Sequence, residues 1–311
     1  MAASRRVRRG LLLGLCLLIL GTVVYFQLHR ASVKQPIGAG PAGPPVPRDR
    51  WMKPWSTRPV LLVGLGDSVT AGFGAPPPLS YFNRLVSNPE DEFPDMKGIC
   101  LRSVFPNLKA VNLSVSGTIS QEHVEEQLPK LEKAGPETLG LVVLTTGGND
   151  LIHSYGRNPP REGAMYGATL EQAKPWIATF EKRLERMFAR IIAAFPGGCH
   201  LFVADIYDPT DGVGDIENAG LPRWPDGEAI LAAYNEAIRR SASKFRQVRV
   251  VPMHDAFLGH GIHCSQRWRT HYRKDDPHYW YFDNLEDPNS RGYDAIRRLF
   301  LLEIQDVLAP K

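Results

Sequence analysis

The first candidate for chemistry is a serine in the block GDSVTAG, residues 66–72, which directly follows an apolar run. This serine, Ser68, stands where a strand is expected to end and a helix to begin. Free backbone N–H groups at a helix N-terminus can stabilise a developing oxyanion. Its hydroxyl is therefore a candidate nucleophile for acyl transfer. The alternative is structural, because Asp67 and Ser68 are both of the residue types that cap helices.

Two further blocks follow the next two apolar runs. The first is NLSVSGT, residues 112–118, and it contains Gly117, whose missing side chain lets the backbone approach a ligand closely. The second is GGND, residues 147–150, and it offers the side-chain N–H groups of Asn149 as donors. Taken singly, each block is also compatible with an ordinary turn at the end of a strand.

In this order, and at successive strand ends, the three blocks resemble the motifs of the SGNH (GDSL-type) hydrolases, a family of lipases and esterases. The resemblance extends over roughly residues 59–309. It implies that Ser68 is the nucleophile and that its backbone N–H, the Gly117 N–H and the Asn149 side chain form an oxyanion hole. It also implies a flavodoxin-like sheet of five parallel strands. Losing one donor from a comparable oxyanion hole costs about 2.7–4 kcal/mol.

The fourth block departs from the family pattern, which is Asp-x-x-His-Pro-Asn-x-x-Gly before the last helix. Aligning on PNSRG, residues 288–292, puts Asp287 in the His position and Asn284 in the Asp position. A serine needs a base to take its proton, and histidine is the usual base near pH 7. Asp287 by itself would be a weaker base than histidine.

The sequence offers several candidates for that base. Asp275 and His278 restore the Asp-x-x-His spacing upstream of Asp287, so we expect His278 to be the base, oriented by Asp275, in an extended loop. An ordinary loop histidine beside a solvated carboxylate would show the same spacing. His260 and His263 are further candidates. The remaining alternatives are an atypical site that uses Asp287, or a domain that has lost hydrolysis.

The elements that would position these residues alternate along the chain. Short apolar runs predict buried strands at 59–66, 109–114, 139–147, 199–206 and 248–253. Stretches with helical period lie at 119–134, 169–195, 227–245 and 290–308. Alternating strands and helices predict a parallel sheet covered on both faces. Together with the resemblance, this predicts a flavodoxin-like three-layer α/β/α sandwich with a five-stranded parallel sheet.

The segment before this domain is predicted to carry it to a membrane. Four arginines at positions 5, 6, 8 and 9 precede an uncharged run at 10–26, which reaches roughly 25 Å at about 1.5 Å per residue. We therefore expect residues 1–30 to be a signal anchor, with the body on the periplasmic or extracellular side. A cleaved signal peptide is the alternative. The Pro- and Gly-rich residues 31–58 are predicted to be an extended tether, and 59–311 the hydrolase domain.

Charge and cysteine content narrow the class further. The chain carries +4 overall, but residues 1–60 hold ten basic residues and one acid, so the remaining residues carry −5. A body of that sign is a poor nucleic-acid scaffold, and no nucleic-acid partner is expected. Cys100, Cys199 and Cys264 lie outside the predicted anchor and form no CxxC pair. One disulfide among them and buried free thiols are both compatible with this spacing.

No metal and no organic cofactor are predicted. The loop DPTDGVGD, residues 208–215, carries carboxylates that suit calcium but lacks the closing Glu of a calcium loop, so we expect a solvated turn. His260 and His263 near Asp255 lack a third metal ligand at convincing spacing. The aromatic run at 278–282 could stack on a substrate or could pack its loop onto the body.

The sequence therefore predicts a membrane-anchored serine esterase or lipase that cleaves carboxylic esters through an acyl-enzyme on Ser68. Its substrates would be small-molecule, glycan or lipid esters of the envelope or exterior. Two alternatives remain open: an acyltransferase whose acceptor is a sugar hydroxyl, and a non-catalytic SGNH-fold module that binds a glycan or an acyl group.

Overall fold

Five parallel strands pair in the order β2-β1-β3-β4-β5, which is the flavodoxin-like strand order. Their bounds are β1 Val60–Gly66, β2 Leu108–Asn112, β3 Leu139–Thr145, β4 Cys199–Ala204 and β5 Val248–Val251. β1 pairs with β2 and with β3, so that Gly64 is in register with Asn112 on one side and with Val143 on the other. The predicted five-stranded parallel sheet is confirmed.

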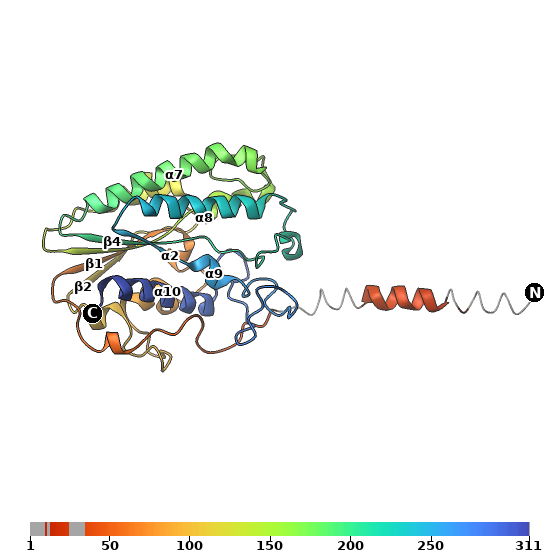
Figure 1. Ribbon diagram of the computed structural model, residues 1–311, viewed down its shortest axis with the longest axis horizontal. Coiled ribbons are helices and arrows are strands. Elements are labelled where there is room, and N and C mark those ends of the chain that lie inside the picture. Colours follow the sequence, from red (N-terminus) through yellow and green to blue (C-terminus); the bar gives the residue numbers. More distant parts are fainter. Residues whose placement is uncertain (1–9, 11–12, 25–34, 311) are drawn as a thin grey trace, which may run out of the picture. The chain divides into compact units, whose positions relative to one another are not determined.

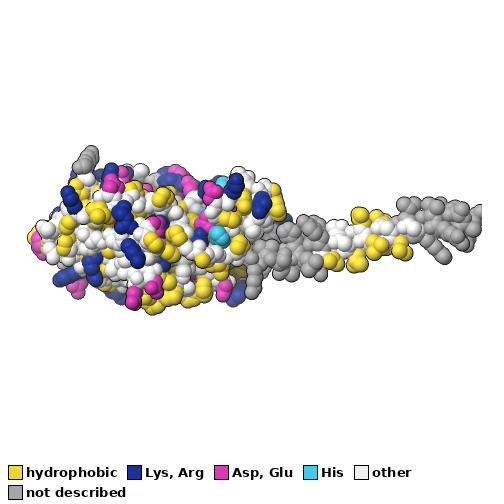
Figure 2. All heavy atoms as spheres, turned by 90° about the horizontal axis from the view of Figure 1, so that it is seen from below, with side chains coloured by type: hydrophobic (Ala, Val, Ile, Leu, Met, Phe, Trp, Pro, Cys, Tyr) yellow, Lys and Arg dark blue, Asp and Glu magenta, His cyan; other side chains and the backbone are white. Residues whose placement is uncertain are grey.

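This computed structural model describes residues 10, 13–24 and 35–310 of the 311-residue chain. The chain divides into two compact units, Met1–Pro36 and Ile37–Lys311, and the sheet belongs to the second. On the face that Figure 2 shows, acidic and basic side chains of this second unit are interspersed.

The α-helices of the second unit have these bounds: α2 Ser68–Ala71, α3 Tyr81–Val86, α4 Leu101–Val104, α5 Ser120–Glu122, α6 Gly148–Ile152, α7 Leu170–Ala193, α8 Gly227–Ser243, α9 Met253–Phe257 and α10 Ser290–Leu308. Short 3₁₀ turns lie at Asp49–Trp51, Pro77–Leu79, Leu128–Lys130, His153–Gly156 and Ile216–Ala219. A π-helical turn, η3, spans His123–Gln127. The long helix predicted over 119–134 is therefore replaced by three short pieces, and Pro129, which has no N–H to donate, lies in the last of them.

Alternate residues of the central strands enter two separate cores. In β3, Leu141 and Val143 belong to the core under α10, whereas Val142 and Leu144 belong to the core under α7 and α8. Figure 1 shows α7 and α8 on one side of the sheet and α10 on the other. Burial on both faces accounts for the continuous apolar runs of these strands.

β2 differs from the prediction of a buried strand. It is an edge strand of the sheet, and its residues 109–112 are exposed. An edge strand has a partner on one side only, and its charged Lys109 is typical of edges that are protected against pairing with another chain.

Residues 37–58, predicted to belong to the tether, are packed against the body. The Ala42 N–H donates to Asp294 Oδ2 at 3.0 Å, and the Trp51 indole N–H donates to Gln305 Oε1 at 2.7 Å. Trp51 is buried in the core under α10. The compact unit therefore begins at Ile37 and not at residue 59, because both acceptors are side chains of α10 and hold this segment in place.

In the first unit, residues 13–24 are helical and expose large apolar side chains such as Leu13 and Leu18. Within the described residues, no helix is long and apolar enough to cross a membrane. The four arginines and residues 25–30 of the predicted anchor lie outside the described residues.

Candidate active site

The three blocks singled out in the sequence are tied to one another through Gly66, the last residue of β1. The Val115 N–H donates to the Gly66 carbonyl at 3.1 Å, which joins the second block to the first. Gln127 holds Gly66 from both sides, because its Oε1 accepts from the Gly66 N–H at 2.8 Å and its Nε2 donates to the Gly66 carbonyl at 2.8 Å. The Asn149 Nδ2 donates to the Thr118 carbonyl at 2.9 Å, which adds the third block. The expected convergence at the carboxyl edge of the sheet is thus present.

Ser68 is the first residue of α2, and Asp67 caps that helix. Asp67 Oδ1 accepts from the Val69 N–H at 3.1 Å and from the Thr145 hydroxyl at 2.6 Å. The structural interpretation of the first block therefore applies to Asp67, whose side chain caps the helix, and the side chain of Ser68 does not. Burial raises the pKa of Asp67 to about 6 despite the hydrogen bond from Thr145.

A chain of hydrogen-bonded hydroxyl groups leads to Asp67 and holds its carboxyl group in place. Thr145 donates its single hydroxyl proton to Asp67, so in the 2.8 Å contact between Thr70 and Thr145 the donor is Thr70. Thr70 then has no proton left for Tyr81, so Tyr81 donates to Thr70 at 2.7 Å. All three donors point toward the carboxyl group that caps α2, and they hold the start of this helix against β3.

His123 and Gln127 support the site and were not singled out from the sequence. The His123 Nδ1 contacts the Thr146 hydroxyl at 2.9 Å, and its Nε2 contacts the Thr118 hydroxyl at 3.0 Å, so the ring joins the end of the second block to the residue just before the third. Burial lowers the pKa of His123 to about 3, which keeps the ring neutral. The signal available in the sequence was two polar residues four apart on a segment predicted to be an amphipathic helix.

Gly117 has a φ of +82°, and a Cβ built there would meet no atom within 4 Å. This left-handed conformation is the reason for a glycine at this position. The residue is exposed and directly precedes Thr118, whose carbonyl accepts from Asn149. The loop that carries Gly117 is therefore bonded to the third block.

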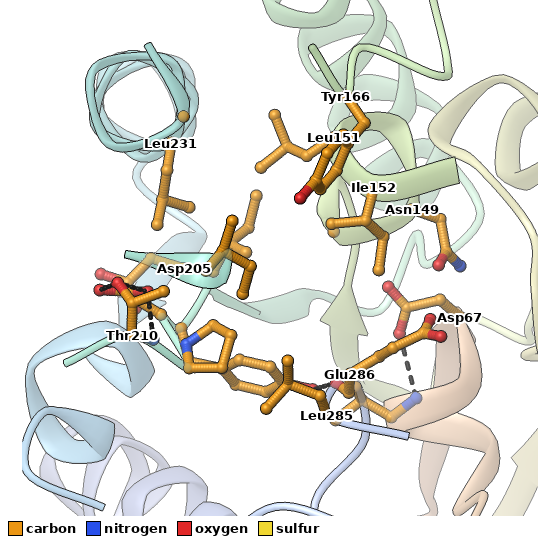
Figure 3. Close-up of a pocket in the computed structure, with 18 of the residues that line it drawn as sticks. Asp67, Asn149, Leu151, Ile152, Tyr166, Asp205, Thr210, Leu231, Leu285 and Glu286 are labelled. Carbon is orange, nitrogen blue, oxygen red and sulfur yellow. Dashed lines mark hydrogen bonds between the residues drawn. The ribbon is translucent and has the colours of Figure 1, made fainter. Parts of the chain in front are cut away.

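An apolar pocket opens beside Ser68, with a volume of about 1090 Å³ including its open mouth. Asp67, Ser68 and Asn149 line it together. Its walls are apolar and aromatic and include Leu151, Ile152, Tyr166, Ile206, Trp224 and Leu231. Figure 3 shows Asp67 and Asn149 at one end of the pocket and Asp205 and Thr210 at the other. The site can therefore hold an apolar group next to the serine.

Carboxyl groups close the far end of the pocket. Burial, and then the charge of Asp208, raise the pKa of Glu228 to about 7, and its Oε1 accepts from the Thr210 hydroxyl at 3.1 Å. Asp208 is itself buried and accepts from the Thr210 N–H at 2.7 Å. Asp211 is also buried and accepts backbone N–H groups of the 259–263 loop. The prediction of a solvated turn at 208–215 is therefore wrong, since these carboxyl groups hold loops together by capturing buried N–H donors.

Asp287 directly follows Glu286, which lines the pocket, and it interacts with Ser68. Only 3% of it is exposed, and its Oδ2 accepts from the Asn284 Nδ2 at 2.6 Å. The Ser68 hydroxyl interacts with this carboxyl group and lowers its pKa, but burial has the larger effect and leaves the pKa raised. Glu286, the preceding residue, lines the pocket, and burial followed by the charge of Asp287 raises its pKa to about 7.

His278 and Asp275, expected to supply the base and its orienting carboxylate, are not paired with each other. His278 Nδ1 contacts Asp276 Oδ1 at 2.5 Å, and Asp276 also accepts from Arg291 Nη2 at 2.6 Å. The His278 ring lies against Gly38, in the segment that precedes the sheet. Among the described residues, no histidine lines the pocket beside Ser68.

The other two candidate histidines have partners elsewhere. His260 stacks on Trp280 with 3.4 Å between ring centroids, and its Nδ1 contacts the His278 carbonyl at 3.0 Å. His263 Nε2 contacts Asp215 Oδ1 at 2.7 Å. The aromatic run therefore packs its loop, since Trp280 is buried. In the part of the chain that the structure describes, no group of three or more His, Cys, Asp or Glu side chains could hold a metal ion, and all four cysteines are free thiols.

The neutral state of His123 gives a testable dependence of stability on pH. At pH 4.5 His123 stays neutral in the folded protein but is protonated in the unfolded chain, because its pKa is lowered from 6.5 to about 3 by folding. Lowering the pH from 7 to 4.5 should thus reduce the free energy of unfolding of the wild type by roughly 2–3 kcal/mol more than that of His123→Gln. Urea unfolding at both pH values measures this difference. Gln121→Ala changes an exposed residue of the same segment, and its free energy of unfolding should fall between the two pH values as much as that of the wild type. An equal decrease for His123→Gln and the wild type would contradict the assignment.

Comparisons with known proteins identify the family of the chain. The model of the GDSL-like Lipase/Acylhydrolase family matches residues 65–295. Similar solved structures include phospholipase A1 from Streptomyces albidoflavus NA297, with 17% identity over 79% of this chain and 99% of that chain and a TM-score of 0.48. An extracellular lipase from Streptomyces rimosus has 18% identity over 80% of this chain and 99% of that chain, with a TM-score of 0.50.

The acetylxylan esterase Axe2 from Geobacillus stearothermophilus has 16% identity over 80% of this chain and 95% of that chain, with a TM-score of 0.49. At 18% identity and a TM-score of 0.50, the likeness to the Streptomyces rimosus lipase concerns the fold alone. None of the curated proteins compared matches the chain significantly. The family match, by contrast, covers most of the chain and includes Ser68, Gly117, Asn149 and the loop that ends at Asp287. The chain therefore belongs to the GDSL-like lipase/acylhydrolase family and is a hydrolase of ester bonds.

Proposed function

We propose that the protein is a serine esterase that cleaves carboxylic esters through an acyl-enzyme on Ser68. The observation that carries this proposal is that Ser68 and Asn149 line the same apolar pocket, at the starts of α2 and α6. An ester carbonyl placed there would meet the nucleophile at one atom and N–H donors at the other. No cofactor is required for this chemistry.

The oxyanion of the tetrahedral intermediate would be held by three donors. Ser68 is the first residue of its helix, so its N–H has no acceptor one turn earlier. Gly117, which is exposed and has a positive φ, would supply a second N–H from the loop after β2. Asn149 would supply a side-chain N–H, since one of its two amide hydrogens is directed to Thr118 and the other remains.

The pocket favours an ester with an apolar acyl or alcohol group. Leu151, Ile152 and Trp224 form part of its wall, and burying such a group contributes about 25 cal/mol for each Å² removed from water. The family alone does not decide between a lipid, a glycan ester and a small secreted ester. Transfer of the acyl group to a sugar hydroxyl would use the same residues, so the acceptor is a separate question from the nucleophile.

Ser68→Ala tests the nucleophile directly. A fluorophosphonate probe should label the full-length wild type, and Ser68→Ala should show no labelling, because the probe reacts only with an activated serine hydroxyl. Ser243→Ala, on the exposed end of α8, should be labelled like the wild type. Labelling that survives in Ser68→Ala would place the nucleophile elsewhere, and an unlabelled wild type would favour a binding module.

Asn149→Ala tests the oxyanion hole. Its kcat/KM for p-nitrophenyl butyrate should fall by about 10²–10³, because one donor to the developing charge is lost. The loss should occur mainly in kcat, since the donor acts in the transition state. A kcat unchanged by Asn149→Ala would contradict the proposed role.

Gas chromatography of the products, with and without an added methyl glycoside, separates hydrolysis from acyl transfer.

We also propose that the chain is anchored in a membrane by its N-terminal segment, with the esterase on the periplasmic or extracellular side. The support is the sequence pattern, in which four arginines precede the uncharged residues 10–26. The large apolar side chains of residues 13–24, which are exposed, are those that a bilayer would cover.

A charge placed in this segment tests the anchor. The full chain should stay in the membrane fraction after a carbonate wash, and Leu17→Arg/Leu18→Arg should move it to the supernatant. Each central arginine costs roughly 2.5–3.5 kcal/mol on insertion. Met52→Arg, which adds a charge at an exposed position of the second unit, should leave the wild-type distribution unchanged. A wild type recovered in the supernatant would contradict anchoring.

A further inference from the structure

The loop before α10 supplies one ionisable partner for the Ser68 hydroxyl, the carboxyl group of Asp287. Asp287 Oδ1 is buried and makes no hydrogen bond of good geometry within the described residues. Ser68 and Glu286, the residue before Asp287, line the same pocket, and the Ser68 hydroxyl interacts with the Asp287 carboxyl group and lowers its pKa. Catalytic hydrogen bonds are often long in a free enzyme and shorten only when substrate is bound. The free lone pairs of Oδ1 are therefore available to Ser68.

Asn284 determines which oxygen of Asp287 stays free. The Asn284 Oδ1 accepts from the backbone N–H groups of Asp287 at 3.1 Å and of Glu286 at 3.3 Å, so its amide nitrogen must be the atom that faces the carboxyl group. That nitrogen donates to Asp287 Oδ2 at 2.6 Å. The orientation of the amide is thus set by two backbone donors, and Oδ1 is the carboxyl oxygen that is left without a hydrogen bond.

The two substitutions relative to the family pattern complement each other. A neutral histidine base needs an acceptor behind it, and the family supplies an aspartate three residues earlier. An anionic aspartate base needs a donor instead, and Asn284 supplies an amide N–H from that same position. If the domain had lost catalysis, nothing would require residue 284 to be a donor when residue 287 is an aspartate. An active aspartate base does require it. The geometry of a serine, a base and a positioning residue is retained with the polarity reversed.

Building on the proposed esterase function, we propose that Asp287 is the general base for Ser68 and that Asn284 is its positioning residue. The competing histidines are engaged elsewhere: His278 with Asp276, His260 with Trp280 and His263 with Asp215.

In this triad Asp287 holds the transferred proton at each step of the reaction. Asp287 takes the Ser68 proton as the serine oxygen bonds to the ester carbon and the carbonyl oxygen becomes an oxyanion. When the intermediate collapses, the carbon–alkoxide bond breaks and the Asp287 carboxylic acid protonates the leaving alkoxide, which departs as the alcohol. Water then attacks the acyl-enzyme and gives its proton to Asp287. That proton returns to Ser68 as the acid product leaves.

Burial favours a base stronger than an ordinary aspartate at position 287. Burial raises its pKa above 3.8, and the side chains that interact electrostatically with it are Asp67, Tyr207, Glu286 and Tyr293. The donors Ser68 and Asn284 act in the opposite direction and favour the carboxylate. Activity should therefore be lost as the pH falls through the raised pKa of Asp287, because protonation removes the base.

The test compares full-length variants by the pH dependence of kcat/KM for p-nitrophenyl butyrate. Asp287→Asn should lose about 10²–10⁴-fold at pH 7, which is the usual contribution of a general base. Asp283→Asn, an exposed carboxylate of the same loop, should match the wild type. Asp287→His should move the acid limb of the profile toward the pKa of histidine, about 6.5. Adding Asn284→Asp to it should raise kcat/KM further, since a histidine needs the acceptor.

Asn284→Ala tests the positioning role by a readout that a purely structural role would not change. Without the amide donor the carboxylate is less stabilised, so the acid limb should shift to higher pH. His278→Gln is the arm for the competing base. If Asp287→Asn keeps wild-type activity, or if His278→Gln alone abolishes it, the triad is overturned while Ser68 labelling still supports the esterase. If the wild type is neither labelled nor active, the esterase proposal itself fails.

Discussion

The close approach of β1 and β3 at their carboxyl ends is the constraint on which the site depends. A Cβ on Gly66 would lie 2.0 Å from the Thr145 carbonyl oxygen, and its φ is +121°, so no side chain can be accommodated there. This contact lets Thr145 reach Asp67, which caps α2 and sets the position of Ser68. Because Gln127 bonds both the N–H and the carbonyl of Gly66, the segment after β2 is drawn to the same point.

The network of side chains that supports the site is both polar and buried. It is stable there because its hydrogen bonds are nearly complete. His123, Gln127 and Thr118 satisfy one another and the backbone around them, so few buried groups are left without a partner. The π-helical turn over His123–Gln127 places these two side chains on the inner face. Turns of this kind are frequent at functional sites because they redirect side chains without ending a helix.

The sheet, its parallel direction and the long helices could be predicted from the sequence, because strands buried on both faces leave long apolar runs and covering helices leave an amphipathic period. The chain order of the blocks likewise located Ser68 and Asn149 in one pocket. The packing of residues 37–58 could not be predicted, since it depends on single hydrogen bonds to Asp294 and Gln305.

The histidine expectation shows a different limit of sequence patterns. Spacing alone made Asp275 and His278 equivalent to the family pair, but spacing does not say which side of a loop faces the serine. The structure pairs His278 with Asp276 and directs it to Gly38, far along the chain from the blocks. The alignment on the residues after position 287 rests on a structural feature instead, because these residues start α10 through the Asn289 cap and a helix start fixes the place of the residues just before it.

An aspartate base changes the electrostatics of the reaction as well as its pH dependence. With histidine, attack creates a cation and an oxyanion from neutral groups. With Asp287, a single negative charge moves from the carboxylate to the oxyanion, and no new pair of charges is formed in the buried site. The donors around the oxyanion must then replace the stabilisation that Asn284 and Ser68 give to the carboxylate, so the oxyanion hole contributes directly to the rate. The neighbouring Glu286 fits this requirement, because burial and the charge of Asp287 raise its pKa to about 7, so it carries only part of a negative charge near neutral pH.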